Sequence, residues 1–249
     1  MRPLEKDLLG VEDVGQLMGV GKATVWRWCR EGRLPCLKVG KHWRVRREAL
    51  ENLLKQRERS TTLVGQLSSF LRVPDSVLAI AQNADILHRL DAAFFQVGEA
   101  RGGLLVKFYG GEDMSEEELL AQFEQNGLEA ERLKRQRRLL MRPEEDPLGG
   151  REDALGRLIE EEAGEGRTVW ASFNWVRPVE LETALEQQER LSKLVYGGQQ
   201  LVVKTAALEE AIDEWSPATL RRAQSSHSGT ILASESGLSL SRLAPMPPS

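Results

Sequence analysis

Residues 19–45 read GVGKATVWRWCREGRLPCLKVGKHWRV, and this stretch decides the fold of the first part of the chain. Gly19 and Gly21 leave room only for a tight corner between two helices, the second of which is predicted over residues 22–30. Gly32 follows that helix in the position where glycine commonly ends one. Two short segments on either side of Gly40 then alternate apolar and polar residues, which predicts a β-hairpin.

Apolar residues at helical spacing frame this stretch on both sides. Before it, a helix is predicted over the segment that carries Val11, Val14, Leu17 and Met18. After it, a third helix is predicted over residues 46–57, with Leu50, Leu53 and Leu54 on one face. Residues 1–57 are therefore predicted to form one small domain.

Positive charge is concentrated in this domain, although the whole chain carries a net charge of −4. Residues 1–59 hold 14 Lys/Arg and 8 Asp/Glu, and the other residues hold 20 and 30. Between residues 22 and 47 there are nine basic residues and one acid, Glu31. A basic module on an acidic body indicates a polyanion partner for the module alone.

The second helix has one apolar and one cationic face. Val25 and Cys29, with Trp28 beside them, lie at the spacing of core residues. The opposite face combines cations with a small residue, which suits the major groove of DNA, where arginine bonds to guanine edges. On this helix the candidate DNA-binding residues are Lys22, Ala23, Thr24, Trp26, Arg27 and Arg30.

The hairpin is expected to contact the DNA backbone. Its alternation predicts that Leu37, Val39, Trp43 and Val45 are buried, so that the cations between them point outward. Outward cations bind phosphates and give affinity and register rather than base specificity. The candidate phosphate-binding residues are Lys38, Lys41, His42 and Arg44.

Residues 8–56 resemble the MerR- and excisionase-type winged helix-turn-helix family. Four pieces at matching spacing carry the resemblance: TVWRW after the glycine corner, EGRLP, the VGK hairpin tip, and WRV before the last helix. The resemblance implies a module that binds double-stranded DNA with its second helix in the major groove.

Both cysteines of the chain, Cys29 and Cys36, lie in this module. With no second pair beside them they cannot complete a zinc site, so no metal is expected. We expect two small, buried or half-buried thiols in the reduced state. A redox switch between them is the alternative.

Residues 58–84 are predicted to be a linker with a short helix, because Ser60-Thr61-Thr62 and Pro74 interrupt the apolar pattern. Over residues 85–243 strand and helix patterns alternate, which predicts a mainly parallel sheet wrapped by helices. The strand candidates are 104–109, 139–142, 168–173, 201–204 and 229–233, and the helix candidates are 115–125, 128–138, 151–164, 178–195 and 216–224. Residues 244–249 are expected to be a disordered tail.

Residues 86–243 resemble the DcmR-type sensory (MEDS) domain, a relative of the KaiC/RecA-like α/β fold. The segments that carry the resemblance are HRLDAAFF, GLEAERLKRQRRLLMRPEEDPL, GRTVWASFNW and TLRRAQSSHSGTIL. An ATPase of this architecture needs a glycine-rich loop that ends in Lys-Ser/Thr. The candidate loop, VGEARGG at residues 97–103, has no such ending. We therefore expect a sensory domain without enzymatic activity.

Ligands of open α/β sheets bind beyond the carboxyl ends of the strands. The candidate ligand-binding residues near such ends are Arg135, Arg138, Arg142, Asp146, Asn174 and Trp175. Arginines beside a carboxylate and an indole suit a guanine nucleotide, so the leading effector is a nucleotide second messenger, cyclic di-GMP in particular. A small organic metabolite is the alternative ligand. In the alternative without a ligand, the arginines pair with nearby glutamates on a helix surface and Trp175 packs in the core.

These features together predict a ligand-responsive, DNA-binding transcription regulator that acts as a homodimer. No apolar run approaches the roughly 20 residues that cross a bilayer, and the N-terminus has no signal-peptide core. We therefore expect a cytoplasmic, nucleoid-associated protein with no membrane partner and no required cofactor. An architectural or excisionase-like DNA-binding factor without a ligand, and an enzyme tethered to DNA, are the alternative functions.

Overall fold

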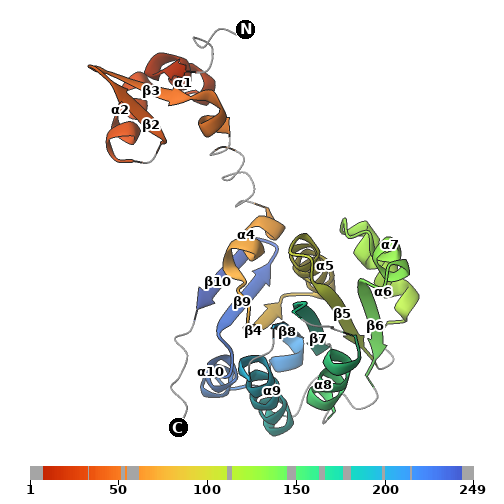
Figure 1. Ribbon diagram of the computed structural model, residues 1–249. Helices are drawn as coiled ribbons and strands as arrows, with labels where there is room; N and C mark the ends of the chain where they lie inside the picture. Colours follow the sequence, from red (N-terminus) through yellow and green to blue (C-terminus); the bar gives the residue numbers. More distant parts are fainter. Residues whose placement is uncertain are drawn as a thin grey trace. The chain divides into compact units, whose positions relative to one another are not determined.

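The computed structural model describes residues 8–32, 34–51, 54, 62–110, 114–144, 150–162, 166–175, 181–197, 200–213 and 215–242. The chain forms two compact units, Met1–Gln66 (unit 1) and Leu67–Ser249 (unit 2), whose elements are labelled in Figure 1. No helix in these described ranges is both long and apolar enough to cross a bilayer.

Unit 1 contains the two helices and the hairpin that its sequence predicts. Its elements are β1 (Leu8–Gly10), α1 (Val11–Met18), α2 (Lys22–Arg30), β2 (Cys36–Val39) and β3 (His42–Arg46), followed by a helix that begins at Arg47. The strands form an antiparallel sheet in the order β1-β3-β2, in which the short β1 was not predicted. The core between helices and sheet is built from Leu9, Val14, Val25, Cys29, Leu34, Val45 and Leu50.

Two glycines make the corner between α1 and α2. Gly19 ends α1 in the left-handed conformation, with φ 65°, which favours glycine. Gly15 has a different role, because a Cβ atom there would lie 2.7 Å from the carbonyl oxygen of Val20. The absence of a side chain at Gly15 therefore lets the corner pack directly on α1.

Unit 2 is a mainly parallel sheet with helices on both faces (Figure 1). Its elements, after α4 (Leu63–Phe70) at the unit boundary, are β4 (Asp75–Ala81), α5 (Ala84–Ala100), β5 (Leu104–Tyr109), α6 (Glu116–Gln125), α7 (Ala130–Arg135), β6 (Leu139–Pro143), α8 (Arg151–Glu162), β7 (Val169–Trp175), α9 (Leu181–Tyr196), β8 (Leu201–Leu208), the 3-10 helix η2 (Glu209–Ile212), α10 (Pro217–Ser225), β9 (Gly229–Ser234) and β10 (Gly237–Arg242).

The seven described strands follow the order β10-β9-β4-β8-β7-β5-β6, and every neighbouring pair is parallel except β9 and β10. This topology, together with unit 1, confirms the predicted fold class: a helix-turn-helix module with a hairpin, followed by an α/β unit with a mainly parallel sheet. The strands alternate their side chains between two helical layers. On one face Phe94 of α5 meets Trp170 of β7 edge-on, with 5.4 Å between ring centroids. On the other face Leu155 of α8 and Leu191 of α9 pack against β5, β7 and β8.

The predicted linker over residues 58–84 is wrong in its second half, because it contains the central strand β4. All seven residues of β4 are buried, and it pairs with β8 on one side and β9 on the other. A strand buried on both faces is a continuous apolar run without alternation. Pro74, interpreted as a chain breaker, directly precedes the strand. Residues 58–61 of the linker and the expected tail, 244–249, lie outside the described residues.

The glycine-rich segment at residues 97–103 also lies elsewhere than expected, because it runs from the end of α5 into β5. Its glycines serve packing: a Cβ atom on Gly98 or Gly103 would lie within 2.7 Å of the Trp170 ring. The turn that leads from β4 into α5 consists of Gln82 and Asn83, and Asn83 caps the helix. A glycine-rich phosphate loop between a strand and a helix is several residues longer than this turn.

Candidate nucleic-acid interface

The outward face of α2 is cationic, as its sequence predicts. Val25 is completely buried and Cys29 nearly so, and this fixes which side of the helix meets the core. The side chains of Lys22, Ala23, Trp26, Arg27 and Arg30 are exposed, and Thr24 is half-buried. No acidic residue lies between Lys22 and Arg30.

Two contacts arrange this face. The guanidinium carbon of Arg30 lies 5.2 Å from the ring centroid of Trp26, a cation–π distance that holds the exposed indole against the helix. Lys22 Nζ lies 3.3 Å from Glu12 Oε1 of α1, with both side chains about 70% exposed (71% and 72%). Because an exposed ion pair of this kind is weak, Lys22 can exchange Glu12 for another anion.

The first strand of the hairpin, β2, has the opposite alternation from the one predicted, whereas Trp43 and Val45 of β3 face the core as predicted. Cys36 pairs with Val45, and Lys38 pairs with Trp43, so these four side chains share the face that meets the core. Lys38 therefore lies on the Trp43 side of the hairpin and not on the predicted outward side, although it is exposed, and its Nζ lies 6.0 Å from the Trp43 ring centroid. The prediction that Leu37 is buried is wrong.

The outward face of the hairpin therefore mixes apolar and basic residues. Leu37 is 44% exposed, and Val39, also expected to be buried, is 55% exposed. Arg44 is Leu37's partner across the ladder and lies half-buried on this outward face. Lys41 and His42 are exposed at the hairpin tip.

Two further cations lie at this surface. Arg46 and Arg47 are exposed where β3 leads into the next helix. They were not among the candidate residues, although they continue the basic run that begins at Lys22. The excess of nine basic residues over one acid between residues 22 and 47 is the signal that would have included them.

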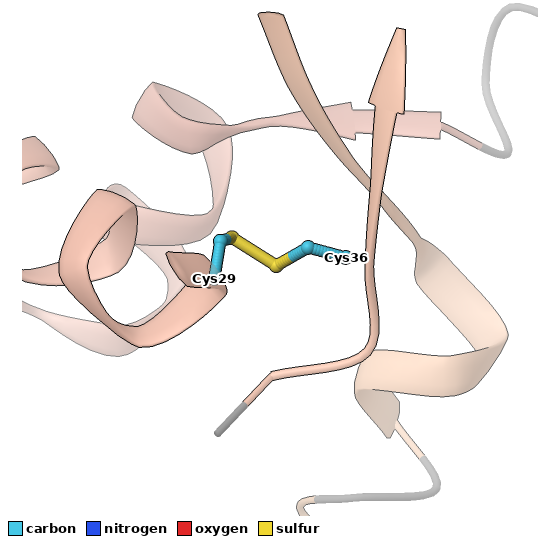
Figure 2. Close-up of a disulfide and its surroundings, with 2 residues drawn as sticks. All are labelled: Cys29 and Cys36. Carbon is cyan, nitrogen blue, oxygen red and sulfur yellow. A yellow bond between two sulfur atoms is a disulfide. The ribbon is translucent and has the colours of Figure 1, made fainter. Parts of the chain in front are cut away.

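A disulfide joins the two elements that carry the candidate DNA-binding residues. Cys29 on the last turn of α2 and Cys36 at the start of β2 are bonded, with their Cα atoms 5.4 Å apart (Figure 2). The expectation of two reduced thiols is therefore corrected. The helix and the hairpin both place their cysteine on the core side, because Val25 and Val45 fix those faces, and so the two sulfur atoms meet.

The arginines expected to bind a ligand in unit 2 do not form one site. Arg135 and Arg138 lie just before β6, whereas Arg142 lies toward its carboxyl end. A helix that precedes a strand ends at the sheet edge where that strand begins. Arg138 Nη1 lies 3.8 Å from Glu99 Oε1, and Arg142 Nη2 lies 3.4 Å from Glu162 Oε1.

The other candidate residues are also separated. Asn174 and Trp175 are neighbours on β7 and point to opposite faces of the sheet. Asn174 Nδ2 donates to Asp91 Oδ2 at 2.7 Å. Trp175 is 6% exposed and packs in the core, 6.4 Å from the Trp215 ring. Asp146 lies outside the described residues.

Comparison with known proteins supports the interpretation of unit 1. Residues 8–58 match the helix-turn-helix domain family. The chain is also 42% identical over 48 residues to two candidate DNA-binding proteins of Mycobacterium tuberculosis, MT0521 of strain CDC 1551 and Rv0500A of strain H37Rv. The matched segment is 19% of this chain and spans 62% of the length of each relative.

Solved structures are similar to this chain at low sequence identity. The ATPase domain of G40P superposes with a TM-score of 0.49 and 9% identity, covering 74% of this chain and 81% of that one. A KaiC-like protein from Pyrococcus horikoshii OT3, PH0186, superposes with a TM-score of 0.42 and 12% identity, covering 65% and 72%. The expectation that the chain is not an enzyme is not borne out, because one of these neighbours is an ATPase domain.

Proposed function

We propose that this protein is a DNA-binding regulator whose unit 1 binds double-stranded DNA with α2 in the major groove. The observation that carries the proposal is the outward face of α2, where Arg27 and Arg30 are exposed beside the small residue Ala23 and no acid interrupts them. The exposed Trp26 ring, held by Arg30, offers an apolar contact of the kind made to thymine methyl groups. The match of residues 8–58 to the helix-turn-helix domain family supports the same conclusion.

We expect the recognition helix α2 and the hairpin region to contact different parts of the DNA. Arg27 and Arg30 on α2 would contact base edges, which gives sequence preference. Lys41, Arg46 and Arg47 would contact phosphates, which gives affinity that falls with salt.

Mobility-shift titrations test this proposal. A randomised duplex library is first selected on the full chain, and the enriched duplex is then titrated at several salt concentrations. Arg27→Ala is expected to cost about 1–3 kcal/mol on the enriched duplex and to relax base preference. Lys41→Ala should weaken binding to all duplexes alike. It should also reduce the slope of log affinity against log salt concentration by about 0.9. Arg190→Ala, which removes an exposed arginine of α9 in unit 2, is the matched control. Failure to enrich any duplex at low salt would refute the proposal.

Binding of a nucleotide effector and formation of a homodimer stay predictions. A cyclic dinucleotide needs arginines for its phosphates, and Arg142, Arg151 and Arg157 line one cavity of about 350 Å³. Within that cavity Arg151 already pairs with Glu144, at 3.0 Å. Calorimetric titration of the full chain with cyclic di-GMP tests the effector, and light scattering with and without DNA tests the homodimer.

A further inference from the structure

Unit 2 holds a cavity of about 320 Å³ where β5, β7 and β8 end beside the first turns of α5. Its apolar walls include Met114, Leu119 and Leu208. Its polar lining includes Lys107 of β5 and Asn174 of β7. The cavity thus combines an apolar wall with a few convergent polar groups, which is the usual composition of a small-molecule site.

Lys107, which lines this cavity, belongs to a buried charge cluster. Lys107 Nζ lies 2.9 Å from Asp91 Oδ2, and Lys204 Nζ lies 2.5 Å from Asp91 Oδ1. All three side chains are at most 2% exposed. Ser172 Oγ donates to the same aspartate at 2.8 Å. Two ammonium groups therefore share one carboxylate, which leaves one positive charge in excess.

The neighbouring ionisable groups do not remove this excess. Glu144 also lines the cavity, but its carboxylate is 3.0 Å from Arg151 Nε, and both side chains are less than 10% exposed. Asn174 bridges the cluster: its Nδ2 donates to Asp91, and its Oδ1 accepts from Lys204 at 3.3 Å. Burying an unbalanced charge is costly in free energy unless a counter-ion approaches it.

His88 is a second polar group at the cavity, and its hydrogen-bonding capacity is not fully used. It lines the cavity from α5, and its Nδ1 is buried without a hydrogen-bond partner among the residues that the structure describes. Burial lowers the pKa of His88, so the ring is neutral at pH 7 and has one N–H to donate. A buried polar atom without a partner calls for a ligand or an ordered water.

We propose that this cavity binds a small organic carboxylate, with Lys107 as its counter-ion, His88 as a hydrogen-bond partner and the Met114–Leu119–Leu208 wall around its apolar body. An anion at Lys107 balances the charge cluster, and the apolar body fills the volume between β5 and α6. The proposal concerns unit 2 alone and does not depend on DNA binding by unit 1.

Binding of a carboxylate beside Lys107 should also change the number of protons that the protein holds, and this change can be measured in addition to the affinity. Burial lowers the pKa of Lys107 to about 8, although the Asp91 carboxylate acts in the other direction; Lys204 lowers this pKa further and Glu144 raises it. His88, on the same side of α5 as Asp91, is neutral near pH 8. A bound carboxylate stabilises the ammonium form, so binding above pH 8 takes up a proton. The calorimetric heat is then expected to depend on the ionisation enthalpy of the buffer.

The test is titration of the full chain with benzoate and with octanoate, compared with the neutral isosteres benzamide and octanamide. The carboxylates are expected to bind about tenfold more tightly than the amides, or better. Lys107→Met is expected to remove this preference, and it leaves Asp91 paired with Lys204, so unit 2 should stay folded. Lys193→Met, an exposed lysine of α9, is the matched control and should bind as the wild type does.

A second variant leaves the charge cluster intact. Ala84→Trp adds bulk at an exposed residue that lines the cavity and should weaken carboxylate binding without touching Lys107. Equal binding of acid and amide, unchanged binding in folded Lys107→Met, or no binding of any probe at millimolar concentration would each overturn the proposal. Inorganic phosphate that binds as tightly as octanoate would overturn the role of the apolar wall.

Discussion

Reduction of the disulfide between Cys29 and Cys36 is expected to destabilise unit 1 while leaving unit 2 unchanged. The bond closes a short loop, with a sequence separation of seven residues. For a loop of about eight residues, the chain-entropy relation gives about 2.5 kcal/mol at 25 °C for the stabilisation that the bond confers. A loss of that size raises the population of opened unit 1 about sixty-fold.

Hydrogen exchange on the full chain, followed by mass spectrometry, measures this loss locally. With a reductant present, amides of α1, α2 and β3 should exchange about sixty-fold faster when they exchange through opening of the whole unit. Peptides from β4, β7 and β8 are an internal control, because the chain has no cysteine outside unit 1. A Cys29→Ser/Cys36→Ser double variant should exchange at the reduced rate under both conditions.

Equal exchange of unit 1 in oxidised and reduced protein, with the bond shown by mass to be intact in one and broken in the other, would refute this reasoning. It would mean that the contacts of Val25 and Val45 alone hold α2 against the hairpin. The same samples also test whether DNA binding depends on the bond, since Cys29 lies on α2, one residue before Arg30.

Three further outcomes are expected. Gly15→Ala should destabilise unit 1 by about 1–3 kcal/mol, because its Cβ would lie 2.7 Å from the Val20 oxygen. Denaturant titration measures this loss, and Gly21→Ala is the control because there is open space around Gly21. Asp91→Asn should destabilise unit 2 by roughly 3–5 kcal/mol, because two buried lysines lose their carboxylate; a melting temperature equal to that of the wild type would contradict this. Burial lowers the pKa of His227 from 6.5 to about 4, so the unfolded chain binds this proton first, and the free energy of unfolding should fall by up to about 3 kcal/mol between pH 6.5 and pH 4. His227→Gln should flatten that part of the pH profile, and a profile identical to that of the wild type would exclude the mechanism.

The faces of helices were easier to predict from the sequence than the faces of strands. The outward residues of α2 follow from Val25 and Cys29, since a period of 3.6 residues allows only one buried stripe. The hairpin offers two alternations that differ by one residue. In β3 the predicted alternation, with Trp43 and Val45 toward the core, is confirmed. In β2 the choice of the more apolar alternation placed Leu37 and Val39 in the core, whereas Cys36 packs there.

Long-range placement could not be predicted from local patterns. The strand β4 lacks alternation because it is buried on both faces, and so its apolar run resembles part of a linker. The prediction that the candidate arginines form one ligand site is wrong, because Arg135 and Arg138 precede β6 while Arg142 is on it. The cavity above Lys107 depends on Asp91 and Lys204, which lie far apart in the sequence and meet only when the sheet has formed.

The position of β4 between β8 and β9 has a consequence for synthesis on the ribosome. The strand is made early, but both of its partners are made after residue 200, so it has no sheet to join until most of the chain has emerged. Unit 1 needs no later segment for its own core and can fold first. A nascent chain stalled between the two stages would carry a folded unit 1 and an incomplete sheet. The apolar β4 would then be exposed to chaperones.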